Sequence, residues 1–196
     1  MSKKVNKEFN SLNEKIIDNE FNSSFEYETS IKSVSDTEEE EEISEKLKQM
    51  SKSISIILTE IIETNSKKKD NNTTDIFESI NIPDISIYDY IIRIISYSNC
   101  DENILISSLV YFDKIGKIKK ITYSNVYKIL FTSILLSLKY HEDEIYNNGY
   151  YSEIAGVSKR ELKQMEYEYF VLLNFNLHIK QELFECFKNA LENCKI

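Results

Sequence analysis

The sequence contains few of the residues on which loop-based chemistry depends. Its 196 residues include only three glycines, one proline and two histidines, and no tryptophan. A nucleotide-binding loop needs several glycines so that its backbone can approach the phosphates, and the sequence has no such loop. No serine stands in the glycine-flanked elbow of a nucleophilic hydrolase. The composition therefore argues against nucleotide-dependent and nucleophilic catalysis.

Cysteine is scarce too. Acidic residues outnumber basic ones, 33 to 24. Cys100, Cys186 and Cys194 form an odd, scattered set with no zinc-ligand spacing, so we expect reduced thiols in the core of an intracellular protein. The formal net charge is −9. Because nucleic acids and anionic membranes bind clustered Lys and Arg, we expect neither as a partner.

Long hydrophobic runs are also missing. The longest, residues 129–138, is far short of the roughly 20 residues of a membrane-spanning helix. The basic residues at the N-terminus are not followed by an apolar segment, which argues against a secretory signal. We therefore expect a soluble protein, located in the cytoplasm, the nucleus or both.

The N-terminal part of the chain divides into three segments. Residues 1–42 are polar and end in a run of glutamates, which predicts a disordered acidic tail. Residues 43–66 carry apolar side chains at helical spacing and predict an amphipathic helix. Residues 67–84 are predicted to be a linker, in which Pro83 sets a turn.

The rest of the chain predicts consecutive helices and no strand, so the fold class is all-α. Ser86 and Ser124 are suitable N-caps, and Ser158 with Glu161 forms a capping box. The last predicted helix covers about 180–193, and residues 181–196 are assigned to this C-terminal helix as a segment. The other predicted helices span about 87–98, 102–115, 125–140 and 159–173.

The predicted helix over 125–140 has apolar residues around nearly its whole circumference. Its polar members, Thr132, Ser133 and Ser137, are small enough for neighbouring helices to come close. A helix that is apolar on all sides lies in the middle of a bundle. We therefore expect four or five helices packed around it.

The acidic stretch that follows this helix, "HEDE" at 141–144, is a poor metal site. A zinc-protease helix needs H-E-x-x-H, but the fifth position is Ile145, and His178 lies in another segment. A calcium loop would need carboxylates at alternate positions and a central glycine. We predict a solvated acidic loop, with no metal and no cofactor.

Four other charged residues stand in or at the ends of the predicted helices. Lys139 ends the apolar helix, where a cation interacts favourably with the helix dipole, and Glu166 lies within 159–173. Spacing alone favours a purely structural interpretation for both. Arg93 and Asp113 have opposite charges within apolar helices, and charged residues are seldom buried unless they are paired. We therefore predict an ion pair between Arg93 and Asp113.

Two long stretches, residues 85–115 and 124–177, resemble the cyclin box and are most similar to the P/U-type cyclins. The shared motifs, in order, are D-Y before the first arginine, Y-x-D-K, S-N-V, K-Y-x-E-D, Y-N-N-x-Y-Y and E-L-x-x-M-E. The resemblance covers roughly residues 76–180. It implies a cyclin box over 85–180, a five-helix bundle around the central apolar helix, with flanking N- and C-terminal helices.

The resemblance also implies a function. Cyclins are not enzymes but regulatory subunits that bind a cyclin-dependent kinase and move its αC helix into the active position. Lys139 and Glu166 match the lysine and glutamate with which cyclins hold backbone groups beside αC. Asp143 is expected to meet a basic residue of the kinase, and Tyr140 and Tyr150 to line the adjoining wall.

The sequence departs from the family pattern at two positions, and a second function is also considered. Glu153 stands where lysine is usual and Ala155 replaces a glycine, which puts the identity of the kinase in doubt. The alternative is a non-activating cyclin-fold scaffold or transcription-associated module that binds protein. Lys139 and Glu166 distinguish the two, since a scaffold has no need of both.

Overall fold

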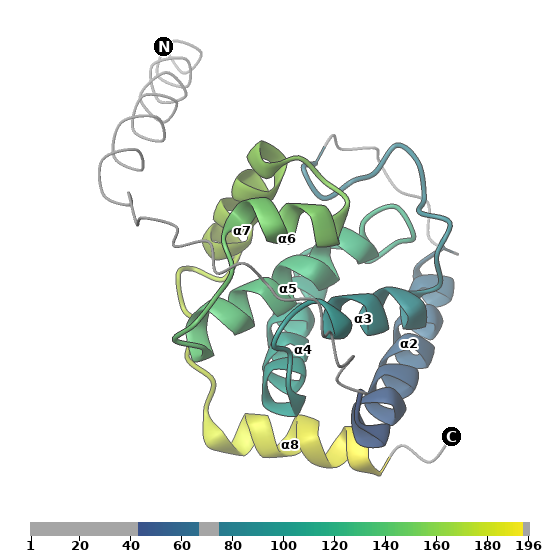
Figure 1. Ribbon diagram of the computed structural model, residues 1–196. Coiled ribbons are helices and arrows are strands. Elements are labelled where there is room, and N and C mark those ends of the chain that lie inside the picture. The colour runs from purple at the N-terminus through teal and green to yellow at the C-terminus, as the bar shows by residue number, and fades with distance from the viewer. Residues whose placement is uncertain (1–42, 67–74, 194–196) are drawn as a thin grey trace, which may run out of the picture. The chain divides into compact units, whose positions relative to one another are not determined.

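The computed structural model describes residues 43–66 and 75–193, and within these ranges it is built from helices without strands, as predicted (Figure 1). None of these helices is long and apolar enough to cross a bilayer. The predicted acidic tail lies outside the described residues, as do Cys194 and much of the predicted linker. The helices are α2 (Glu45–Ser66), α3 (Ile87–Ser96), α4 (Glu102–Gly116), α5 (Val126–His141), α6 (Asn148–Ala155), α7 (Lys159–Leu172) and α8 (Gln181–Glu192).

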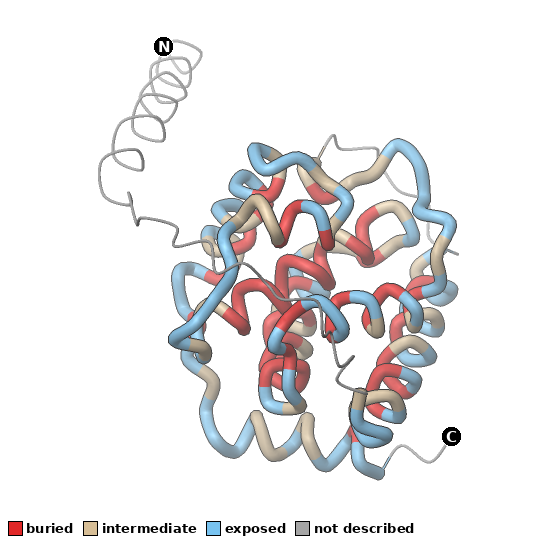
Figure 2. The backbone as a smooth tube through the Cα atoms, in the orientation of Figure 1, coloured by how far each residue is buried: buried red, intermediate tan, exposed pale blue. Residues whose placement is uncertain are grey.

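Helix α5 is the central helix, as its sequence predicts. It packs against α3, α4, α6 and α7, and Figure 2 shows it buried along most of its length. From Val126 to Leu138 only Lys128 is not fully buried. Of the small polar residues, Ser137 donates a hydrogen bond of 3.0 Å to the carbonyl of Ile104 in α4, whereas Thr132 and Ser133 donate to carbonyls of α5 itself. The bundle around one apolar helix is therefore confirmed.

Helices α2 and α8 flank this bundle. Helix α2 packs against α3 and α8, and α8 also packs against α4. A salt bridge of 2.5 Å joins Lys46 of α2 to Glu102 of α4, and Lys46 also lies 3.4 Å from Glu192 of α8. The buried side of α2 is the apolar stripe that its sequence predicts, formed by Met50, Ile54, Leu58 and Ile62.

Two of the three predicted N-caps are correct. Ser86 caps α3 by accepting a hydrogen bond from the amide of Asp89, and Ser158 caps α7 by accepting one from Glu161. Ser124 was expected to cap α5, but the N-cap position belongs to Asn125. The Ser124 hydroxyl instead donates to a carboxylate oxygen of Glu78, which joins the segment before α3 to the start of α5.

Pattern reading on the individual residues missed helix α6. Its N-cap and first two residues are Asn, Asn and Gly, which are typical of turns, and the helix is only eight residues long. Asn147 stabilises its start by accepting hydrogen bonds from the amides of Gly149 and Tyr150. Gly156, with a φ of 71°, ends it in the left-handed conformation that glycine adopts without strain.

The predicted ion pair between Arg93 and Asp113 is wrong. Both residues are described, and each has another partner. Asp113 forms a salt bridge of 2.5 Å with Lys117, one turn further along α4, whereas the Arg93 guanidinium donates to the carbonyl of Glu153 in α6 at 3.1 Å. The prediction assumed that both charges were buried, but Arg93 is exposed and the Asp113 side chain is 41% exposed, so neither needs the other.

Candidate partner-binding site

The structure brings Lys139 and Glu166 into direct contact. Lys139 lies in the last turn of α5, and Glu166 lies in the middle of α7, which packs alongside. The ammonium group of Lys139 forms an ion pair with Oε1 of Glu166. The two side chains are 24% and 14% exposed, so the pair is partly shielded and still open to solvent on one side. The expected convergence at the edge of the bundle is therefore present.

A third residue, Asn148 at the start of α6, completes this cluster. Its Oδ1 accepts a hydrogen bond of 2.6 Å from the Lys139 ammonium, and its Nδ2 donates one of 2.6 Å to Oε2 of Glu166. We call Lys139, Asn148 and Glu166 the clamp. Sequence reasoning did not single out Asn148, although it stands within the Y-N-N-x-Y-Y motif, because nothing in the sequence tells which asparagine faces Lys139.

The clamp has the hydrogen-bonding capacity to hold a peptide backbone. A lysine ammonium has three N–H donors, and within the described residues Glu166 and Asn148 take two of them. The Glu166 carboxylate has further acceptor lone pairs. One free donor beside free acceptor positions can bind a backbone carbonyl and a backbone N–H of a partner. Charge-assisted hydrogen bonds of this kind are stronger than neutral ones.

Aromatic residues follow two of the clamp residues along the chain, and Tyr140 and Phe175 among them are exposed. Phe170 follows Glu166 by four residues on the same face of α7, and its ring lies 6.2 Å from that of Phe175. Phe175 is 66% exposed, with a φ of 55° that non-glycine residues seldom adopt. Tyr140, next to Lys139, is 50% exposed. Exposed aromatic residues around a partly shielded charge pair are typical of a protein-binding surface.

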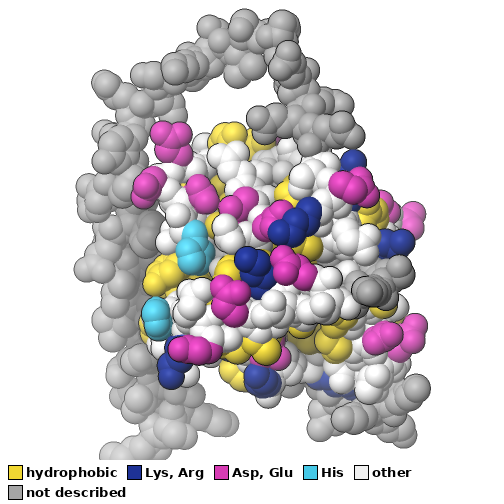
Figure 3. Space-filling view, turned by 90° about the horizontal axis from the view of Figure 1, so that it is seen from below, with side chains coloured by type: hydrophobic (Ala, Val, Ile, Leu, Met, Phe, Trp, Pro, Cys, Tyr) yellow, Lys and Arg dark blue, Asp and Glu magenta, His cyan; other side chains and the backbone are white. Residues whose placement is uncertain are grey.

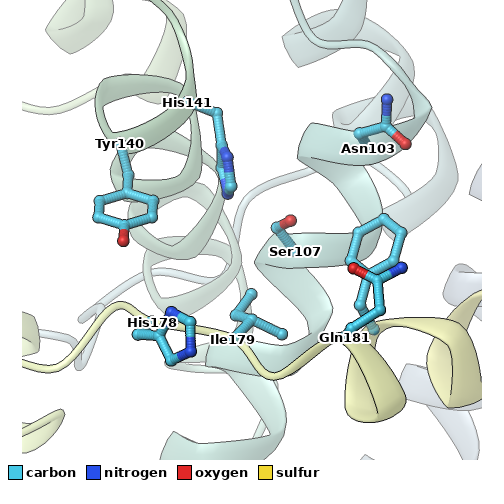
Figure 4. Close-up of a pocket in the computed structure, with 8 residues that line it drawn as sticks. Asn103, Ser107, Tyr140, His141, His178, Ile179 and Gln181 are labelled. Carbon is cyan, nitrogen blue, oxygen red and sulfur yellow. The ribbon is translucent and has the colours of Figure 1, made fainter.

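Tyr140 also lines a pocket of about 290 Å³, and both histidines of the chain are among its other lining residues (Figure 4). His141, at the end of α5, and His178, after α7, surround the same space together with Ser107 of α4. In the space-filling view the two imidazoles lie close together beside hydrophobic side chains (Figure 3). Among the described residues, no group of three or more His, Cys, Asp or Glu side chains is arranged to hold a metal ion.

Tyr150 does not share the side of α6 that Asn148 uses. Two residues along a helix are about 200° apart around its axis, so their side chains leave in nearly opposite directions. The Tyr150 ring lies 4.3 Å from that of Tyr146 and 6.0 Å from that of Tyr151. Burial, and then the nearby Tyr146 hydroxyl, raises the pKa of Tyr150, so this residue is a neutral hydroxyl at physiological pH. Its predicted contact with a kinase stays a prediction.

Asp143 lies in the acidic loop between α5 and α6. It is exposed, and it makes none of the ion pairs found among the described residues. Its carboxylate is therefore open to a basic partner group, as the resemblance implies, but its predicted partner contact stays a prediction.

The two described cysteines differ in their surroundings. Cys100 is buried, and burial raises the pKa of its thiol, whereas Cys186 is exposed. The predicted core position is therefore confirmed for Cys100 and wrong for Cys186, which lies on the outer side of the C-terminal helix.

Comparison with known proteins gives a consistent family match. The family model described as cyclin matches residues 17–177. Cyclin-U2-2 of Arabidopsis thaliana is 32% identical over 122 residues, which are 61% of this chain and 53% of that protein. Cyclin-U4-3 of the same plant is 31% identical over 134 residues, 67% of this chain and 61% of its own length. Cyclin-P3-1 of Oryza sativa subsp. japonica is 30% identical over 135 residues, 68% and 56% respectively.

These matches cover only part of the length of each relative. The chain spans between about half and three fifths of the three relatives named above. The family model begins at residue 17, closer to the N-terminus than the motifs that carry the resemblance. The limits proposed for the cyclin box, 85–180, stay a prediction.

Proposed function

Because this chain belongs to the cyclin family and is of the P/U type, we propose that it binds and activates a cyclin-dependent kinase by positioning the kinase αC helix. Membership of the family makes it a regulatory cyclin. The kinase partner and its activation are the parts that we propose.

The observation that carries the proposal is the clamp. Lys139 and Glu166 are 27 positions apart in the sequence, yet their side chains meet at a partly exposed edge of the bundle. Their charges offset each other, so the site can bind the neutral backbone of a partner helix without a large desolvation penalty for an unpaired charge. Phe175 and Tyr140 offer exposed apolar surface on which such a helix can pack.

Binding at this surface would activate a kinase through the position of one helix. In protein kinases, a glutamate of αC must pair with the lysine that holds the ATP phosphates before phosphoryl transfer is efficient. A cyclin that grips the backbone at one end of αC stabilises the orientation in which that pair forms. In this proposal the cyclin takes no part in the chemistry, which agrees with the lack of a glycine-flanked serine elbow and of a phosphate-binding loop in the sequence.

The test uses the full chain and a panel of purified cyclin-dependent kinases. Affinity is measured by titration calorimetry and activation by phosphorylation of a peptide substrate. We expect one kinase at least to bind and to gain activity. Lys139→Ala and Glu166→Ala should each lower its affinity by about 2–5 kcal/mol, because each change leaves the other charge unpaired at the interface.

The chain supplies its own matched control. Lys128 of α5 and Glu161 of α7 form a second ion pair between the same two helices, 2.8 Å long and distant from the clamp along α5. Lys128→Ala and Glu161→Ala should leave kinase affinity unchanged. Equal losses in both pairs would show that the effect comes from the bundle and not from the clamp, and would refute the proposed site. Tight binding without a gain in kinase activity would favour the non-activating scaffold.

A further inference from the structure

We infer that Asn148 is a positioning residue of the clamp, an inference that rests on the proposed kinase-binding function. Its carboxamide joins the two charged side chains through one hydrogen bond to each, 2.6 Å long in both cases. In this role Asn148 sets the directions in which Lys139 and Glu166 offer their remaining donor and acceptors to a partner backbone.

Each of the three adjacent residues at the start of α6 has a different task, which leaves Asn148 available. Asn147 is the N-cap, and its Oδ1 accepts from the amides of Gly149 and Tyr150. At Gly149 an added Cβ would lie 2.8 Å from that oxygen, so the glycine keeps room for the cap. The side chain of Asn148 takes no part in this cap and is free to reach α5 and α7.

The chemistry of the carboxamide fits its two neighbours. A carboxamide has one acceptor oxygen and a donor nitrogen, and here the oxygen faces the cation while the nitrogen faces the anion. A carboxylate at this position would lose the donor and repel Glu166, whereas an ammonium group would repel Lys139. An amide is therefore the group of this size that satisfies both charges at once.

The bridge also limits how Lys139 can move. A lysine side chain has four rotatable bonds, and holding it in one rotamer on binding costs conformational entropy. Two hydrogen bonds to groups on different helices hold the ammonium in place before a partner arrives. Preorganisation of this kind strengthens binding because the ordering has already occurred in the free protein.

The test compares four forms of the full chain: wild type, Asn148→Ala, Asn148→Asp and, as a matched control, Asn189→Ala on the exposed part of α8. The probe is the kinase of the panel that binds the wild type. Asn148→Ala should weaken binding about tenfold, because two charge-assisted hydrogen bonds near solvent are lost. Asn148→Asp keeps the size and shape of the side chain but removes its donor, and it should weaken binding at least as much.

A second measurement needs no kinase. The exchange of the Lys139 ammonium protons with water, followed by nitrogen NMR, reports how firmly the side chain is held. We expect Asn148→Ala to speed this exchange and Asn189→Ala to leave it unchanged. Asn148→Asp keeps an acceptor for Lys139 and loses only the donor to Glu166, so its exchange should stay slow while its affinity falls. The double variant Asn148→Asp/Glu166→Gln keeps a carboxylate against Lys139 at constant charge, and its exchange should stay slow as well.

The two readouts separate failure of this inference from failure of the proposed function. If Asn148→Ala matches the wild type in both exchange and affinity, the residue only fills space and the inference falls. If no kinase of the panel binds the wild type, or if Lys139→Ala binds as tightly as the wild type, the proposed function falls. The proton exchange then still decides whether Asn148 holds the clamp together.

Discussion

The two ends of helix α5 have the same kind of ion pair in different surroundings. Near the start of α5, Lys128 pairs with Glu161 at 2.8 Å, and in its last turn Lys139 pairs with Glu166. Both glutamates belong to α7. Residue types and helix partners are the same at the two ends, so the difference in their roles must come from what surrounds them.

At the first end, every donor of the lysine is used inside the protein. The Lys128 ammonium donates to the backbone carbonyls of Ile76 and Glu78, at 3.2 Å and 3.0 Å, as well as contacting Glu161. The Glu78 side chain in turn accepts from Asn125 at 2.8 Å. Lys128 is only 15% exposed. This end of α5 fixes the segment that precedes α3, and it has little left to offer a partner.

At the second end, capacity is left over. Among the described residues, Glu166 and Asn148 use two donors of Lys139, and the exposed Tyr140 directly follows it in the chain. A partly buried ion pair between a lysine and a glutamate therefore does not by itself mark a binding site. The unused donor and the exposed apolar neighbours distinguish the clamp from an internal tie.

The largest effect that the comparison predicts is on kinase binding after charge reversal. In the double variant Lys139→Glu/Glu166→Lys the ion pair can re-form, and the Asn148 amide can rotate to suit it. We expect the melting temperature to stay near that of the wild type. Affinity for the kinase should fall by about 2–5 kcal/mol, because a carboxylate now meets the partner's carbonyl. Unchanged affinity in titration calorimetry would remove the distinction between the two ends.

The next effect is on stability and concerns the first end. Lys128→Ala removes the donor to two backbone carbonyls and leaves Glu161 unpaired, so the free energy of unfolding should fall by about 2 kcal/mol. Urea unfolding followed by circular dichroism measures this change. Lys139→Ala is the control and should cost about 1 kcal/mol or less, since its surroundings are more open. If Lys139→Ala were the more destabilising change, the clamp would be the structural tie.

Much of the fold could be predicted because it follows from apolar periodicity and capping. The helix over 125–140 was placed at the centre from its apolar circumference, and it is observed at Val126–His141. Ser86 and Ser158 marked helix starts correctly because their side chains bond to nearby amides, an interaction encoded within four residues. Local chemistry of this kind is visible in a sequence.

Contacts between distant segments could not be predicted in the same way. Residue spacing alone favoured a purely structural interpretation for Lys139 and Glu166. The prediction that they lie in one site came only from the resemblance to cyclins. Arg93 and Asp113 were paired wrongly because the spacing does not show that both charges reach solvent. Asn148 was missed because its role depends on the direction in which α6 leaves the acidic loop. That direction is set by packing and not by the local sequence.

A smaller effect is expected at the start of α6, which supplies the part of the clamp that the first end lacks. In Gly149→Ala the new Cβ would meet Oδ1 of Asn147 at 2.8 Å and displace the cap, which should cost about 1 kcal/mol of stability. Gly116→Ala is the matched control, because there the nearest atom would lie at an ordinary 3.8 Å. Thermal unfolding compares the two. Equal melting temperatures would mean that the cap adjusts without shifting Asn148.

The smallest effect concerns backbone strain in the two residues that follow α7. Among the described residues, Asn174 and Phe175 are the non-glycine residues with positive φ, at 51° and 55°, and both follow the helix that carries Glu166. Asn174→Gly should stabilise the free chain by about 0.5 kcal/mol, because the relief of strain slightly exceeds the entropy that glycine adds to the unfolded state. Kinase affinity should not change, since the exposed ring is kept.

Phe175→Gly relieves similar strain but removes that ring. If the strain holds the aromatic side chain out for a partner, this variant should bind the kinase more weakly than Asn174→Gly does, while its free energy of unfolding stays close to that of the wild type. Titration calorimetry and urea unfolding on the same two proteins give both numbers. Equal affinities would mean that Phe175 lies outside the bound surface, and the second end of α5 would then rely on the clamp and Tyr140 alone.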